Sequence, residues 1–205
     1  MNSISHHPTD ETLAAFASGT LDEARSVVVS MHMSLCATCK SKARKYEAIG
    51  GALLDQASPA AMKPDALQKV LGMIDTNLPA SAVRAEEPLD RYQLGKWRWV
   101  WPGVRQRSVS VPVDSNIKVF MLKAEPGIQL PHHKHTGYEW TCVLEGAFEH
   151  QFGRYGPGDF DEADETLEHK PTICEGAACV CLVALQGNIE FQSGWGRLIQ
   201  PLLRL

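Results

Sequence analysis

Residues 127–146 read GIQLPHHKHTGYEWTCVLEG, and they indicate the fold of the second half of the chain. Its first part predicts a strand, on which His133 and His135 stand two positions apart and therefore face the same side. Glu139 follows on the neighbouring turn and completes a set of three ligands on one side of a metal ion. Such a set leaves positions open for water, oxygen or a substrate. The stretch therefore predicts an open metal site inside a β-barrel.

The residues around this stretch also predict short strands. From Tyr92 onward apolar and polar side chains alternate, as in the segment WRWVW at 97–101. Turns rich in glycine and proline separate one expected strand from the next. This pattern is typical of an all-β, jelly-roll-like barrel.

The pattern that runs from Gly127 to Gly146 resembles the first sequence motif of the cupin family. The second cupin motif is degenerate, because its Gly-Pro-Gly turn at 156–158 is not followed closely by a histidine. The nearest candidate is His169, which comes after an acidic insertion, and His150 is its rival. We expect a divalent metal here, with Zn²⁺ placed ahead of Fe²⁺ and Mn²⁺.

The first 78 residues predict helices instead of strands. Four helices are expected. The first covers residues 9–18, the second begins near Thr20 or Asp22 and ends at about Leu35, and the last two cover 37–55 and 64–77. An aperiodic segment bounded by Pro79 and Pro88 follows them and reads as a linker. We therefore expect an all-α module at 1–78, a linker at 79–91 and a β domain at 92–205.

His32, Cys36 and Cys39 form the most specific chemical pattern of the helical module. His32 and Cys36 are four residues apart on one helix face, and Cys39 follows one turn later, so the three can converge on one ion. Zinc accepts this mixture of imidazole and thiolate. A fourth ligand has to come from elsewhere in the module, and His6 and His7 are both available. The pattern predicts a closed zinc site.

Leu67, Val70, Leu71 and Ile74 form an apolar stripe on the fourth expected helix. Two interpretations of this stripe stay open at the level of sequence. It is either internal core of the helical module or the binding face for a partner protein.

The composition excludes some functions. The net charge is −4 without any basic block, so we expect no direct contact with nucleic acid. No apolar run approaches the ~20 residues that span a bilayer, and the first residues contain no apolar signal core. We therefore expect a cytoplasmic protein that does not bind membranes.

The six cysteines are expected to be free thiols or metal ligands, because the chain shows no sign of secretion. Cys179 and Cys181 stand two apart on a predicted strand, where their Cα atoms are roughly 7 Å apart, at the limit for a disulfide. They are either buried core residues or oxidant-reactive thiols beside the metal pocket.

The helical module resembles the ChrR-type anti-sigma factors, a branch of the zinc-binding anti-sigma factors. The resemblance is carried by HHPxD at 6–10, AxGTL at 17–21 and HxSLC at 32–36. The order of helical module, linker and cupin matches this branch as well. By position in the branch, the N-terminal zinc ligand falls on His7, and the displaced cupin ligand falls on His169.

The resemblance implies a regulatory function. The helical module would bind an alternative sigma factor of the extracytoplasmic-function (ECF) type and block its access to RNA polymerase, with zinc as a structural ion. The cupin would take part in the response to oxidative stress such as singlet oxygen. The protein would be a monomer or a 1:1 heterodimer with the sigma factor, and it would not be an enzyme.

The alternative is a dioxygenase-like cupin metalloenzyme with an accessory zinc module. The displaced second-motif histidine counts against ordinary dioxygenase activity, although not against metal binding. The order of the segments favours the regulator, because an accessory module needs no helical layout specific for a sigma factor.

Overall fold

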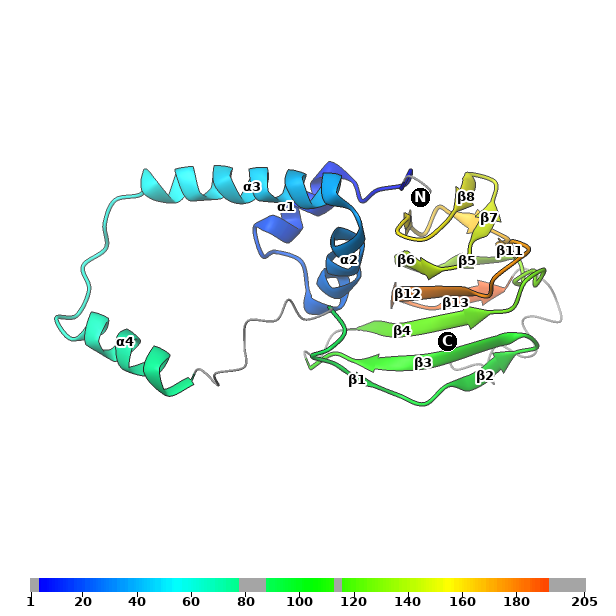
Figure 1. Ribbon diagram of the computed structural model, residues 1–205. Helices are drawn as coiled ribbons and strands as arrows, with labels where there is room; N and C mark the ends of the chain where they lie inside the picture. The colour runs from blue at the N-terminus through cyan, green and yellow to red at the C-terminus, as the bar shows by residue number, and fades with distance from the viewer. Residues whose placement is uncertain (1–3, 78–87, 113–115, 192–205) are drawn as a thin grey trace.

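The computed structural model describes residues 4–77, 88–112 and 116–191. The described chain begins with four helices and continues with short strands only (Figure 1). The helices are α1 (Asp10–Ala17), α2 (Glu23–Leu35), α3 (Ala37–Asp55) and α4 (Ala66–Asn77). The boundary expected at residue 78 follows the end of α4, and most of the expected linker lies outside the described residues.

Local capping sets the ends of the first three helices. The Thr9 side chain accepts the N–H of Thr12 at the start of α1, and the Asp22 carboxylate accepts the N–H of Arg25 at 2.9 Å at the start of α2. Cys36 ends α2 and begins α3, and its sulfur accepts the N–H of Cys39. The break between the two helices therefore lies within the predicted metal-binding pattern.

The strands form three antiparallel sheets in the described part of the chain. The largest sheet has the order β1-β3-β4-β12-β6-β9, with β2 paired to β3. Its strands are β1 (Gln93–Leu94), β2 (Arg98–Trp101), β3 (Val104–Ser110), β4 (Ile117–Ala124), β6 (Glu139–Glu145), β9 (Phe160–Ala163) and β12 (Cys179–Gln186).

The two smaller sheets hold three strands each, in the orders β10-β5-β13 and β11-β7-β8. Their strands are β5 (His133–His135), β7 (Phe148–His150), β8 (Gly153–Tyr155), β10 (Glu168–His169), β11 (Thr172–Ile173) and β13 (Ile189–Phe191).

Strand β12 lies between two hydrophobic cores. Val180, Leu182 and Ala184 face the helices, whereas Cys181 and Val183 face the interior of the β domain. Both faces are buried, which explains why this strand is apolar at nearly every position instead of alternating.

Helix α2 packs on the sheet through β6, β12 and β4. Val28 of α2 and Leu182 of β12 are fully buried in one common core. The guanidinium of Arg25 lies 5.3 Å from the ring centre of Trp140, and the Tyr92 hydroxyl donates to Glu23 at 3.0 Å. The helical module and the β domain are therefore packed together and not merely joined by a linker.

The second half of α3 and the whole of α4 extend away from this common core (Figure 1). Only Cys39 and Ala43 of α3 are buried. The predicted stripe of α4 is exposed to solvent, and so are large apolar side chains near the end of α3. We call this set the projecting apolar surface: Ile49, Leu53, Leu54, Leu67, Val70, Leu71 and Ile74.

Candidate metal sites

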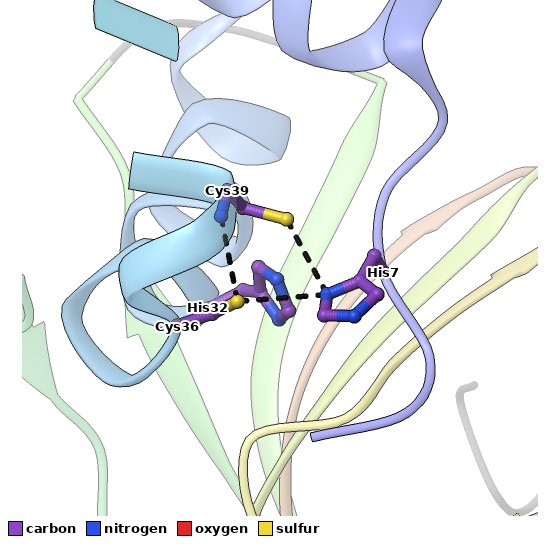
Figure 2. A group of neighbouring side chains, drawn as sticks. All are labelled: His7, His32, Cys36 and Cys39. Atoms are coloured by element: carbon purple, nitrogen blue, oxygen red, sulfur yellow. Dashed lines mark hydrogen bonds between the residues drawn. The ribbon is translucent and has the colours of Figure 1, made fainter. Parts of the chain in front are cut away.

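His7, His32, Cys36 and Cys39 meet at the junction of α2 and α3 (Figure 2). His7 precedes α1, His32 lies in the last turn of α2, and the cysteines flank the start of α3. Nδ1 of His7 lies 3.5 Å from Sγ of Cys36 and 3.4 Å from Sγ of Cys39. Ligand atoms around a tetrahedral zinc ion are separated by about 3.5 Å. The group therefore has the dimensions of a closed zinc site.

The sequence left open whether His6 or His7 belongs to this group, and the structure brings His7 into it. The ring of His6 instead stacks on Tyr155 of the β domain, with 4.1 Å between the ring centres.

His32 is held in the form that a metal requires. Its Nδ1 lies 2.7 Å from the carbonyl oxygen of Gly158, which can only accept, so Nδ1 carries the proton. Its Nε2 is buried without a hydrogen-bond partner. Burial lowers the pKa of His32 to about 4, more than the hydrogen bond to Gly158 raises it. A neutral imidazole with an unsatisfied buried lone pair is a ready ligand.

The cysteine pair fits the same group. Burial, followed by the neighbouring Cys36, raises the pKa of the Cys39 thiol to about 12. The buried Cys39 thiol therefore resists ionisation until a cation balances the thiolate charge, and a bound Zn²⁺ ion would supply that charge. The donor set of two histidines and two cysteines therefore suits zinc.

The second candidate site lies inside the β domain. Strands β5 and β10 are paired with His133 opposite His169. Nε2 of His169 lies 2.9 Å from Nε2 of His133 and 3.1 Å from Nε2 of His135. All three side chains are buried. Three imidazole nitrogens that converge in this way can share a metal ion.

Electrostatics keep these histidines neutral. Burial lowers the pKa of His135 to about 4, and burial together with the neighbouring His133 lowers that of His169 to about 2. Nδ1 of His135 and Nδ1 of His169 are buried without hydrogen-bond partners. Neutral imidazoles are the form that binds a divalent metal.

Glu139, the other predicted ligand of this site, lies at its edge. It begins β6, and its Oε2 is 3.8 Å from Nδ1 of His135. Burial raises the pKa of Glu139 to about 7. The group whose ligand atoms lie within 4.8 Å of one another contains the three histidines without Glu139. The structure therefore brings three of the four predicted residues together and places the fourth beside them.

Sequence reasoning missed Asp161 on β9. Its Oδ2 lies 3.2 Å from Nε2 of His150, and both belong with His169 to a further group of potential ligands. His150 was considered as a rival of His169, but the structure places the two side by side, with 5.4 Å between ring centres. Strand alternation from Phe160 onward is the signal that could have placed Asp161 on the inner face.

A cavity of about 110 Å³ lies next to these residues. Its polar wall is formed by His133, Glu139, Thr141, Asp161 and His169. The remaining wall is apolar and includes Trp101, Phe120, Phe148, Ile173, Val183 and Phe191. The cavity can therefore hold a small, mostly apolar molecule in contact with the histidine group.

Cys179 and Cys181 line the same cavity, and their sulfur atoms are 3.6 Å apart. The hydrogen bond with Cys179 and burial raise the pKa of Cys181 well above its usual value. A thiol with a raised pKa stays protonated and is a weak nucleophile. This favours the interpretation of Cys179 and Cys181 as buried core residues over their interpretation as reactive thiols.

None of the described helices combines the length and the apolar character that crossing a membrane requires.

Residues 91–188 match the family model described as the ChrR Cupin-like domain. The chain is 37% identical to the anti-sigma-E factor ChrR of Cereibacter sphaeroides, over 98% of this chain and 99% of that protein. Its structure is similar to ChrR in the crystal structure of Rhodobacter sphaeroides SigE in complex with the anti-sigma ChrR, with a TM-score of 0.76 and 36% identity. That likeness covers 90% of this chain and 100% of the matched chain.

These similarities extend over both halves of the molecule. They confirm the predicted fold class, an all-α module followed by an all-β cupin domain. They also confirm the resemblance on which the regulatory interpretation rests. The chain belongs to the ChrR family of anti-sigma factors.

Proposed function

We propose that this protein is an anti-sigma factor that binds an ECF-type sigma factor in the cytoplasm and keeps it from RNA polymerase. The helical module, residues 1–78, would make the inhibitory contact, and the cupin domain, residues 92–205, would regulate it. Support comes from the family of the chain and from the related ChrR, which has been crystallised with SigE.

The observation that carries this proposal is the projecting apolar surface. Leu54 is 74% exposed, and Leu67 is 63% exposed. Isolated exposed apolar residues are ordinary, but seven on two consecutive helices that extend away from the common core are typical of segments that a partner covers. The proposal therefore assigns the α4 stripe to the sigma factor and not to the core of the module.

Zinc would act as a structural ion in this module. His7 comes from the segment before α1, whereas the other three ligands come from the α2–α3 junction. A bound ion would link the N-terminal segment to the start of α3, from which the projecting part of the module extends. A small helical module gains much of its folding free energy from such an ion.

The cupin domain would hold a second divalent metal, Zn²⁺ ahead of Fe²⁺ or Mn²⁺. His133, His135 and His169 would be its ligands, with Glu139 joining them when the ion is bound. We propose that oxidative stress, of which singlet oxygen is one source, acts on this domain and favours a state that releases the sigma factor.

The cavity beside the histidine group also favours a second candidate function. A metal ion with an adjoining apolar cavity is an arrangement that cupin metalloenzymes could use for a small substrate. Oxygen consumption with a diketone-like substrate would support this alternative, whereas it is not expected of a regulator.

Co-expression tests the proposed function. An ECF-type sigma factor from the same organism is produced together with the tagged full-length chain. The molar mass of the purified complex is then measured by light scattering. We expect a 1:1 complex that survives gel filtration. Failure of each ECF-type sigma factor of that organism to co-purify would contradict the proposal.

A further inference from the structure

Residues of the cupin domain contact the candidate zinc site of the helical module and the segment before it. The turn at 156–159, which joins β8 to β9, lies directly against it. The carbonyl oxygen of Gly158 accepts a hydrogen bond from Nδ1–H of His32 at 2.7 Å, although the two residues are 126 positions apart. A ligating histidine depends on such an acceptor for its tautomer and its ring orientation.

Asp159 in the same turn holds the segment that carries His7. Its Oδ1 accepts the N–H of Ser5 at 2.7 Å and the N–H of His6 at 2.9 Å, and its Oδ2 accepts the N–H of Gly156 at 2.8 Å. The N–H of Phe160 donates in turn to the carbonyl of His6 at 3.1 Å. The peptide groups immediately before His7 are therefore fixed to the cupin domain.

Asp159 is suited to this role because it is buried and ionised. Only 5% of the residue is exposed. Burial by itself would raise its pKa, but the N–H groups of Gly156, His6 and Ser5 outweigh burial and lower the pKa. Hydrogen bonds from backbone N–H groups to a buried carboxylate are among the stronger ones in proteins.

Residues Ser5 to His7 precede α1 and have no helical hydrogen bonds of their own. His7 is also exposed, whereas the other three members of its group are buried. Its position therefore depends on what anchors the residues just before it, and most of that anchorage comes from Asp159.

We propose that Asp159 of the cupin domain is a positioning residue for the zinc site of the helical module. The proposal rests on the proposed structural role of zinc and adds that the zinc site spans both domains. Asp159 does not touch the ion. It places His7, while the carbonyl of the preceding residue orients His32.

Strand β9 contacts both the candidate zinc site and the cupin cavity. In β9, the ring of Phe160 packs against His32 with 5.6 Å between ring centres, and Glu162 lies beside Thr9 and Thr12. Asp161 lies between them on the opposite face of the strand, where it lines the cavity and contacts His150. If a change in the cavity shifted β9, the shift would therefore act on His32 and on the segment that contains His7.

Cobalt binding to the full-length chain tests the proposal. Co²⁺ ligated by thiolate gives a charge-transfer absorption band, and the histidine group of the cupin contains no thiolate. Because Cys179 and Cys181 lie near the cupin histidines, the part of the band that disappears in the Cys36→Ser/Cys39→Ser variant is taken as the signal of the Cys36–Cys39 site. The test variant is Asp159→Asn. The matched control is Asp164→Asn, whose carboxylate accepts only local hydrogen bonds, from Thr166 and Leu167, among the bonds described.

We expect the affinity for Co²⁺, read from this band, to fall roughly 10- to 100-fold in Asp159→Asn, as for other partners of metal ligands. The control should stay within about twofold of the wild type. An unchanged affinity in Asp159→Asn would overturn the proposal.

A second variant guards against simple misfolding of the cupin. Ser5→Pro removes one N–H donor to Asp159 from the other side of the contact and leaves the cupin sequence intact. It should weaken Co²⁺ binding in the same direction, and normal binding by Ser5→Pro would overturn the proposal. Absence of the band in the wild type would instead refute the zinc site itself.

Discussion

Truncating the α4 stripe should weaken binding to the sigma factor without destabilising the free protein. The double variant Leu67→Ala/Leu71→Ala removes two side chains from the projecting apolar surface. Alanine has the highest helix propensity, so α4 itself should be retained. Leu67 is 63% exposed and Leu71 is 46% exposed, so about half of each residue is left for a partner to cover.

The expected loss of affinity follows from this exposed area. Full burial of a leucine side chain contributes about 1.5–3 kcal/mol, so two half-exposed leucines together contribute about that amount on binding. This corresponds to a dissociation constant that is roughly 10- to 100-fold higher. The stability of the free protein should change by only about 0.5 kcal/mol, because neither side chain lies in the core.

Titration calorimetry with the purified sigma factor measures the affinity, and thermal unfolding of the free protein measures stability. Leu94→Ala is the matched control, because it removes an exposed leucine from β1, away from the projecting helices. The reasoning is refuted if the double variant binds as tightly as the control. It is also refuted if the free double variant unfolds several degrees below the wild type, because the stripe would then be packed inside the module.

Three further predictions concern the metal sites. Cys36→Ser or Cys39→Ser should remove one zinc ion per chain and abolish binding to the sigma factor, and a zinc-free variant that still binds normally would contradict the structural role. Because the pKa of Cys39 is raised to about 12, zinc must displace the thiol proton when it binds at neutral pH. The zinc affinity should therefore rise about tenfold or more per pH unit between pH 6 and 8, as measured by competition with a chelator. An affinity that does not change with pH would exclude this. His133→Ala or His169→Ala should leave basal inhibition intact but blunt release of the sigma factor under oxidant in a reporter assay. Loss of the cupin metal with normal release would show that the second site is only structural.

Much of the fold follows from local rules in the sequence. The side chain of Asp22 caps α2 and Cys36 caps α3, so these boundaries depend on residues next to them. The spacing of His133 and His135 on β5 follows from strand alternation alone. Elements defined by neighbouring residues were therefore predictable in type and in approximate extent.

Contacts between distant segments were not predictable in this way. Nothing in the residue spacing around His32 indicates that the carbonyl of Gly158 accepts a hydrogen bond from it, because that contact depends on how α2 packs on the sheet. The same holds for Asp159, whose partners Ser5 and His6 lie more than 150 positions earlier in the chain. The grouping of Asp161 with His150 likewise depends on which strands of the barrel become neighbours.

Inhibition of the sigma factor itself can be measured in a reconstituted transcription assay. RNA polymerase core and the ECF-type sigma factor that co-purifies with this chain transcribe a promoter that depends on that sigma factor, and the full-length protein is added in increasing amounts. We expect transcription to fall to background near one zinc-loaded chain per sigma factor, and the Cys36→Ser/Cys39→Ser variant to have no effect. Unchanged transcription with excess zinc-loaded protein, or equal inhibition by the zinc-free variant, would contradict it.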